Sequence, residues 1–261
     1  MTIKTALITG GASGLGYEFA TLLAKDAYHL ILIDIDSEKL KETKKKLEDK
    51  YKTQVITIRK DMSTHNCASE LFEEIKETPI DVLINNAGFG LYGHFHNTDW
   101  EREASMLNLH IISTTHLTKL ILKGMVEKGQ GKILNMSSLA AFQPGPLMSI
   151  YYASKAYILS FSEAIANELK GTGVTVTVLC PGQTKTSFQE VVSQETSENK
   201  IAFNMASPDE VAKYGYKAML NGESVVIPGN FNKFLSFLPR ILPRNIAAAI
   251  VRKIQEKNRA D

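Results

Sequence analysis

Short runs of β-branched and apolar residues alternate with longer amphipathic runs along most of this chain. The expected strands are residues 3–9, 29–34, 54–59, 81–85, 131–136, 174–180 and 224–228, and the expected helices include 15–26, 37–51, 65–77, 98–127 and 151–170. The strand runs are almost continuously apolar, as is typical of a parallel sheet with helices on both faces. The alternation predicts an α/β fold: one domain, residues 1–261, built on a doubly wound parallel sheet of seven strands.

Charge and cysteine content narrow the class of protein further. A net charge of +2 gives no reason to expect nucleic acid as a partner. Cys67 and Cys180 lie far apart and without the spacing of metal ligands, which fits a reducing compartment. The chain opens without a signal-peptide pattern, and no apolar run approaches the length of a membrane span. We expect a cytoplasmic protein with no membrane span.

Two regions break the alternation. Residues 183–206 are too long for an ordinary connection, and we predict that they form a lid over the substrate. Residues 230–261 combine aromatic and aliphatic side chains with seven Lys or Arg and two acids. We expect this segment to be an apolar and basic helical tail. It could pack on the core, contact another subunit or make peripheral contact with a membrane surface.

A glycine-rich turn, Thr9-Gly10-Gly11-Ala12-Ser13-Gly14-Leu15-Gly16, directly follows the first expected strand and opens a helix. Glycines permit a tight turn and let the backbone approach a diphosphate, while the helix N-terminus supplies N–H groups. Taken alone, such a turn could be an ordinary strand-to-helix connection. Its position favours a dinucleotide site of the Rossmann type. The predicted contacts are Gly10, Ser13, Gly14, Leu15 and Gly16.

Asp34 ends the second expected strand, 20 residues beyond Gly14. An acid at this place can accept hydrogen bonds from the adenosine ribose hydroxyls, and its charge repels a 2′-phosphate. Neither Ser13 nor Ile35 is a lysine or arginine that could bind such a phosphate, and Lys39 is expected to be a solvated surface residue. Asp34 therefore predicts NAD(H), with NADP(H) as the alternative. A simple turn aspartate is the non-functional interpretation.

Further motifs follow in order along the chain. Asn85-Asn86-Ala87-Gly88 ends the fourth strand, Ser138 follows the fifth, and Tyr151-x-x-x-Lys155 opens a long helix. Pro181-Gly182 follows the sixth strand. Together with the glycine turn, these motifs make the chain resemble the short-chain dehydrogenase/reductase family, in its short single-domain branch, over about residues 3–227.

The resemblance implies how the remaining residues bind the cofactor. Asp61 and Met62 would contact the adenine. Three residues after the fourth strand would line the adenosine side: Asn86, Ala87 and Gly88. Four residues after the sixth strand would hold the nicotinamide: Pro181, Gly182, Thr184 and Thr186. Many sequences near this one in the family carry Arg after the second strand, and Asp34 departs from that pattern.

The resemblance also implies a catalytic tetrad of Asn108, Ser138, Tyr151 and Lys155. Ser138 would hydrogen-bond the reacting oxygen, Lys155 would hold the nicotinamide ribose, and Asn108 would hold a water that passes protons to solvent. Ser137 is the rival of Ser138. We expect the protein to be a homodimer or homotetramer.

The chemistry of Tyr151 and Lys155 agrees with these roles. Residues four apart on a helix share one face. A phenol with an ordinary pKa of about 10 is a poor base at neutral pH, and a neighbouring ammonium favours its ionised form. Tyr151 could then protonate a carbonyl oxygen as hydride arrives, or deprotonate an alcohol in the reverse direction. Its rival, Tyr152, has Ala156 where the lysine is required.

The leading hypothesis is therefore an oxidoreductase that transfers hydride between a nicotinamide cofactor and an apolar alcohol or carbonyl compound. The expected substrate-lining residues include no Lys or Arg: Phe142, Pro144, Pro146, Leu147, Met148, Phe188, Val191 and Val192. Two alternatives stay open, a catalytically silent dinucleotide-binding regulator and a membrane-surface carbonyl reductase for lipid-type substrates. His94 and His96 have no acid or cysteine at ligand spacing, so we predict no metal.

Overall fold

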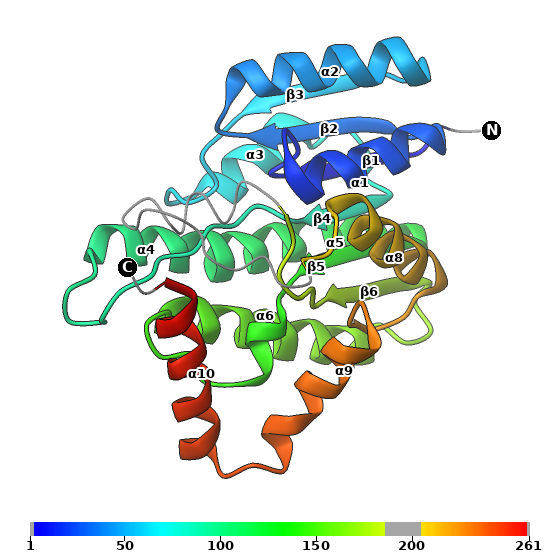
Figure 1. The fold of residues 1–261 in the computed structure, drawn as a ribbon. Coiled ribbons are helices and arrows are strands. Elements are labelled where there is room, and N and C mark those ends of the chain that lie inside the picture. Colours follow the sequence, from blue (N-terminus) through cyan, green and yellow to red (C-terminus); the bar gives the residue numbers. More distant parts are fainter. Residues whose placement is uncertain (1–2, 186–204, 260–261) are drawn as a thin grey trace.

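One parallel sheet organises the molecule (Figure 1). The computed structural model describes residues 3–185 and 205–259. Its seven strands follow the order β3-β2-β1-β4-β5-β6-β7, and every neighbouring pair is parallel. The strands are β1 Thr5–Thr9, β2 His29–Asp34, β3 Val55–Arg59, β4 Val82–Asn85, β5 Gly131–Met136, β6 Val174–Leu179 and β7 Val225–Val226. The predicted doubly wound sheet of seven strands is confirmed.

Helices cover both faces of the sheet. One face carries α1 (Gly14–Lys25), α2 (Ser37–Tyr51) and α8 (Pro208–Asn221), and the other carries α3 (Cys67–Ile75), α5 (Thr114–Lys128) and α6 (Ser149–Glu168). Ile8 of β1 packs in the core with Phe19 of α1, whereas its neighbour Leu7 packs in the opposite core with Leu71 of α3. Successive strand residues point to opposite faces. This explains why the strands read as continuous apolar runs.

The helix expected over residues 98–127 is interrupted. It divides into α4 (Trp100–Leu107), a π-helical turn (Asn108–Ser113) and α5. A π-helical turn inserts a wider turn into the helix, so the side chains on either side of it change their facing. The periodicity of the sequence did not reveal this interruption.

The C-terminal segment packs on the body of the molecule as two helices, α9 (Asn230–Phe237) and α10 (Arg244–Arg259). They are drawn in orange and red in Figure 1. Val251 of α10 packs against Ala140, Met148 and Tyr152, and the Gln255 amide donates a hydrogen bond of 2.7 Å to the Tyr152 hydroxyl. The tail therefore forms part of the wall beside the predicted site.

Two predictions fall partly outside the described residues. Residues 186–204 of the predicted lid, with Phe188, Val191 and Val192, lie there, and so does Thr186. Among the helices that the structure does describe, none has the length and apolar content to cross a membrane.

Candidate active site

A cavity of about 1660 Å³ lies at the carboxyl ends of the strands. This is the place where open α/β sheets bind their ligands. It exceeds the roughly 300–1,000 Å³ of an ordinary ligand pocket, so it has room for a dinucleotide and a substrate. Most predicted site residues line it: Gly10, Ser13, Gly14, Leu15, Asp34, Asp61, Met62, Asn86, Ala87, Gly88, Ser138, Tyr151, Lys155, Pro181, Gly182 and Thr184. The described lining does not include Gly16 or Asn108.

Gly16 packs the start of α1 against the glycine turn. A β-carbon on Gly16 would lie 1.9 Å from the carbonyl oxygen of Gly10 and 2.7 Å from Asn86 Nδ2. Gly10 itself has a φ of 64°, in the region that glycine favours. Gly16 therefore shapes the turn through close packing, and its predicted contact with a cofactor stays a prediction.

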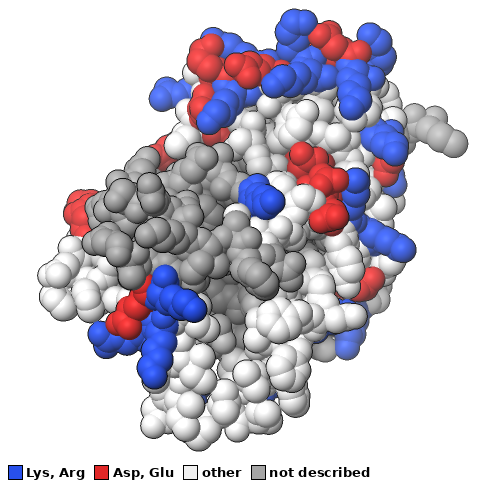
Figure 2. All heavy atoms as spheres, in the orientation of Figure 1, with Lys and Arg blue, Asp and Glu red and all other residues white. Residues whose placement is uncertain are grey.

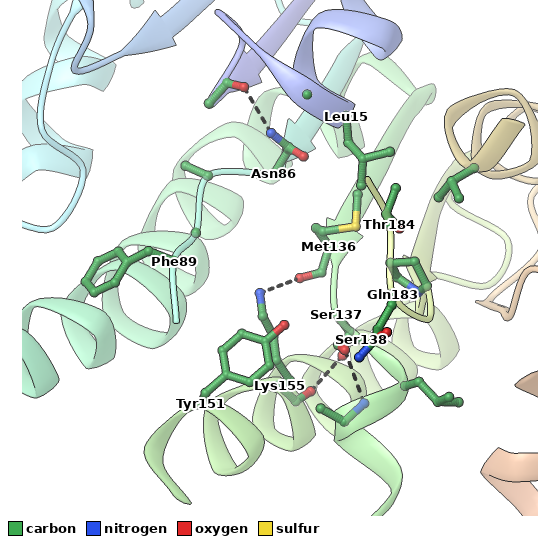
Figure 3. A pocket seen from close by; sticks show the side chains of 18 of the residues that line it. Leu15, Asn86, Phe89, Met136, Ser137, Ser138, Tyr151, Lys155, Gln183 and Thr184 are labelled. Atoms are coloured by element: carbon green, nitrogen blue, oxygen red, sulfur yellow. Dashed lines mark hydrogen bonds between the residues drawn. The ribbon is translucent and has the colours of Figure 1, made fainter. Parts of the chain in front are cut away.

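Asn86 ties the end of β4 to the same turn. Its Nδ2 donates hydrogen bonds of 3.0 Å to the carbonyl oxygens of Thr9 and Gly10, and Figure 3 draws one of the two. The Thr9 hydroxyl oxygen accepts from the amides of Asn86 at 3.0 Å and Ala87 at 3.1 Å. These four hydrogen bonds fix the glycine turn relative to the loop that follows β4.

The Asp34 carboxylate is held in place by backbone amides. One oxygen accepts from Ala12 at 3.1 Å and the other from Asp36 at 3.2 Å. The lysines that line this end of the cavity are engaged with acids: Lys39 pairs with Asp36 at 3.3 Å, and Lys60 pairs with Glu74 at 2.8 Å and with Glu70 at 3.2 Å. An oriented carboxylate thus dominates the end of the cavity where the ribose of a dinucleotide would lie.

Tyr151 and Lys155 project from the first turns of α6 into the middle of the cavity (Figure 3). Lys155 is 4% exposed, and its ammonium donates a hydrogen bond of 3.1 Å to the carbonyl oxygen of Met136. The ammonium nitrogen lies 5.7 Å from the centre of the Tyr151 ring. Burial lowers the pKa of Lys155 to about 8. This pair can supply and remove a proton at an oxygen in the cavity.

Both rivals of the predicted catalytic residues make other contacts. The buried Ser137 hydroxyl donates to the carbonyl oxygen of Lys155 at 2.8 Å. Ser138 begins a short 3-10 turn, Leu139–Phe142, by accepting from the Ala140 amide at 3.1 Å, and lies at the cavity with Tyr151. Tyr152 turns toward α10, where Gln255 binds its hydroxyl. All four residues line the cavity, and it is the hydrogen bonds of Ser137 and Tyr152 to other groups that favour Ser138 and Tyr151 for the predicted roles.

His110, two residues beyond Asn108, contacts Tyr151. Asn108 begins the π-helical turn and is only partly buried. His110 is 1% exposed. The centre of its ring lies 6.0 Å from the centre of the Tyr151 ring, and the two rings meet edge-on. His110 is therefore a neighbour of Tyr151 that sequence reasoning missed, and the predicted role of Asn108 stays a prediction. The sequence signal that could have indicated His110 was a polar residue two positions after Asn108 on the same expected helix.

Among the described residues, the remaining cysteines and histidines form no competing site. Both cysteines are free and buried, and burial raises the pKa of the Cys180 thiol to about 12. His94 and His96 lie beside each other, with ring centres 5.6 Å apart. Within residues 3–185 and 205–259, no cluster of three or more His, Cys, Asp or Glu could hold a metal ion.

The family profile described as short chain dehydrogenase matches residues 4–222. The chain belongs to this family. As a short-chain dehydrogenase it is an oxidoreductase that uses a nicotinamide cofactor, as its motifs predicted.

Relatives of this short-chain dehydrogenase carry the names of ketoacyl and 3-oxoacyl-CoA reductases and of hydroxysteroid dehydrogenases. Ketoacyl reductase HetN of Nostoc sp. is 34% identical over 87% of this chain and 79% of its own. Hydroxysteroid dehydrogenase-like protein 1 of Gallus gallus is 33% identical over 90% of this chain and 70% of its own. Very-long-chain 3-oxoacyl-CoA reductase of Rattus norvegicus is 32% identical over 67% of this chain and 58% of its own.

Solved short-chain dehydrogenases share the fold. One from Sphingobium yanoikuyae in complex with NADPH has a TM-score of 0.81 at 25% identity, over 92% of this chain and 96% of its own. Another from Burkholderia phymatum, in complex with NAD, has a TM-score of 0.81 at 22% identity, over 91% of this chain and 93% of its own. Neighbours of this short-chain dehydrogenase therefore bind either cofactor.

Proposed function

We propose that this protein interconverts a large apolar carbonyl compound and its alcohol, with Tyr151 as the general acid and base. The buried Lys155 beside Tyr151 at the centre of the cavity carries the proposal. The nicotinamide, when bound, supplies or accepts hydride. The Tyr151 hydroxyl gives a proton to the carbonyl oxygen or takes it from the alcohol, and Ser138 hydrogen-bonds the same oxygen. Lys155 favours the ionised phenol and holds the nicotinamide ribose.

We propose NAD(H) as the preferred cofactor. The oriented Asp34 carboxylate accepts hydrogen bonds from ribose hydroxyls and repels a 2′-phosphate. Lys39 and Lys60, the bases nearest to that end among the described lining residues, are already paired with acids. A 2′-phosphate would have to compete for them.

Apolar side chains support the substrate class. On the side of the cavity away from the glycine turn, the lining includes Phe89, Leu139, Met148, Phe231, Leu235 and Ile254. Met148 was expected there, whereas the described lining does not include Phe142, Pro144, Pro146 or Leu147. Arg102 is the basic residue on this side, and its guanidinium lies over the Phe89 ring at 5.3 Å. The names of the ketoacyl and hydroxysteroid relatives also support a large, mostly apolar substrate.

A turnover screen tests the proposal. Purified protein would be assayed with NADH and with NADPH against long-chain ketones, steroid ketones, acyl thioesters with a 3-oxo group and small polar ketones, following the reduced-nicotinamide absorbance. We expect the highest kcat/KM for a large apolar carbonyl with NADH. Preference for small polar ketones would overturn the substrate class. Cofactor binding without turnover of any compound would favour the silent regulator.

The C-terminal helices support peripheral contact with an anionic membrane. Exposed apolar residues gather on these helices and on the connection between them: Phe231, Phe234, Phe237, Ile241, Ile246, Ile250 and Ile254. Lys and Arg side chains lie over α10, and the surface over α9 is mostly uncharged on the face that Figure 2 shows. Residues 230–261 hold seven bases and two acids, while the rest of the chain holds 23 bases and 26 acids. An apolar face beside basic side chains is typical of helices that lie on anionic lipid.

Vesicle sedimentation tests that contact. We expect wild-type protein to sediment with phosphatidylglycerol vesicles, and Phe234→Ser with Phe237→Ser to abolish this. Phe95→Ser is the matched control, because Phe95 is 62% exposed and Phe234 is 59% exposed. Two results together would assign this apolar face to a homodimer or homotetramer instead. Wild-type protein would not bind vesicles, and the tail variant would have a different oligomeric mass. Cytoplasmic location stays a prediction.

A further inference from the structure

His110 is a buried titratable residue to which the proposed reaction gives no role. It lies in the π-helical turn between α4 and α5 and is 1% exposed. Its ring meets Tyr151 edge-on, and Phe89 lies 6.2 Å from it, centre to centre. π-helical turns inside longer helices occur often at functional sites. Here the turn places an imidazole directly against the acid/base residue.

The Nδ1 side of His110 is bound to α6. Nδ1 lies 2.9 Å from Ser154 Oγ, and the Ser154 hydroxyl donates to the carbonyl oxygen of Tyr151 at 2.8 Å. Because a serine hydroxyl has a single proton, its oxygen is left to accept from His110, and we assign the imidazole proton to Nδ1. His110 is thereby tied through Ser154 to the backbone of Tyr151.

The Nε2 atom of His110 lies on the side of Lys155. It is buried and has no hydrogen-bond partner among the described residues. A β-carbon built on Gly88 would lie 2.8 Å from Nε2 and 3.6 Å from Lys155 Nζ, so both nitrogens border the same small space. Burial, and after it the charge of Lys155, lower the pKa of His110 well below its ordinary value. The imidazole is therefore neutral, with an unused lone pair near the buried ammonium.

We propose that His110 is a positioning residue for Lys155, whose ammonium the Nε2 lone pair stabilises across the space beside Gly88. The proposal rests on the proposed function, in which charged Lys155 eases the ionisation of Tyr151. Tyr151 is the other titratable neighbour of His110. Cys180 also acts on Lys155, but its pKa of about 12 keeps the thiol neutral. Met136 already accepts a hydrogen bond from Lys155 with its carbonyl oxygen. The proposed contribution of His110 is the Nε2 lone pair, which has no hydrogen-bond partner among the described residues.

The pH profile of kcat/KM for alcohol oxidation tests this role. Without the Nε2 acceptor, the Lys155 ammonium is less stable and Tyr151 is harder to deprotonate. We therefore expect His110→Leu to lower kcat/KM about tenfold or more and to move the acid limb about one pH unit higher. His110→Asn, which retains an acceptor oxygen, should restore most of the limb position. His116→Leu, on α5 and outside the described cavity lining, is the matched control.

An evenly reduced rate with an unmoved acid limb in His110→Leu would overturn the proposal, because it would assign His110 to packing alone. Near-ultraviolet circular dichroism and cofactor titration would establish that the variant folds. If His110→Leu does not fold, Ser154→Ala takes its place, because it removes the hydrogen-bond partner of His110 Nδ1. The proposal then requires that Ser154→Ala also moves the acid limb to higher pH. Full activity in Tyr151→Phe would instead contradict the proposed function itself.

Discussion

The ammonium nitrogen of Lys155 lies 5.7 Å from the centre of the Tyr151 ring, and the carbonyl oxygen of Met136 holds it there at 3.1 Å. Lys155 thus approaches Tyr151 as a fixed buried cation instead of a mobile surface lysine. A buried charge acts through a medium of low polarity, so its effect on a neighbouring phenol is stronger than in water. The first two predictions follow from this arrangement.

Replacing Tyr151 by Phe should remove the acid/base group and leave the fold intact. We expect kcat to fall by roughly 10²–10⁴-fold, the range of general acid/base catalysis, with cofactor affinity changed little. Tyr157→Phe is the control, because Tyr157 lies on the outer side of the same helix and stacks on Phe161. Turnover of Tyr151→Phe within tenfold of wild type would contradict the assignment.

Lys155 should make the free energy of unfolding depend on pH. Its pKa of about 8 in the folded protein is below the ordinary 10.5 of the unfolded chain. The folded state therefore bears the cost of a buried charge below pH 8 and is relieved of it as pH rises toward 10.5. Relative to Lys155→Met, the wild-type free energy of unfolding should increase across that window.

Urea titrations at intervals of pH measure this difference. The comparison with Lys155→Met is needed because the raised pKa of Cys180 changes stability in the opposite sense between pH 9.0 and about 12, which overlaps the upper part of that window. A constant difference between the two proteins would show that Lys155 keeps an ordinary pKa in the folded state.

Removing the Asp34 carboxylate should reduce the preference for NAD(H) over NADP(H). In Asp34→Ala the ribose hydroxyls lose an acceptor and a 2′-phosphate loses a repelling charge. We expect NADH to bind about tenfold more weakly and NADPH more tightly than in wild type, measured by the fluorescence of the reduced cofactors. Asp36→Ala removes a nearby charge without removing that acceptor, so it should change the ratio less. Tighter NADPH than NADH binding in wild type would contradict the proposed preference.

Gly16→Ala should disrupt the phosphate-binding turn, because its β-carbon would lie 1.9 Å from the Gly10 carbonyl oxygen. Relief of such overlap costs typically about 1–3 kcal/mol of stability, and the displaced turn should lose affinity for the dinucleotide. Gly124→Ala in α5 is the control, since its β-carbon would meet nothing within 4 Å. Equal cofactor affinities for the two variants would refute a shaping role for Gly16.

The sequence by itself determined the sheet and the order of the motifs. Strand residues such as Leu7 and Ile8 are buried on opposite faces, so the requirement for apolar residues is continuous and visible locally. The glycine turn and the Tyr151–Lys155 spacing are equally local, because each depends on one turn of chain. The strands and both motifs could therefore be predicted from the sequence alone.

The tertiary structure decided which polar side chains reach the reacting centre. The π-helical turn changes the facing of residues 108–113, and within it His110 meets Tyr151. The contact of Val251 with Tyr152 brings the tail to the cavity from a hundred residues away in the chain. Neither follows from periodicity, because helix interruption and long-range docking depend on how several elements fill space together.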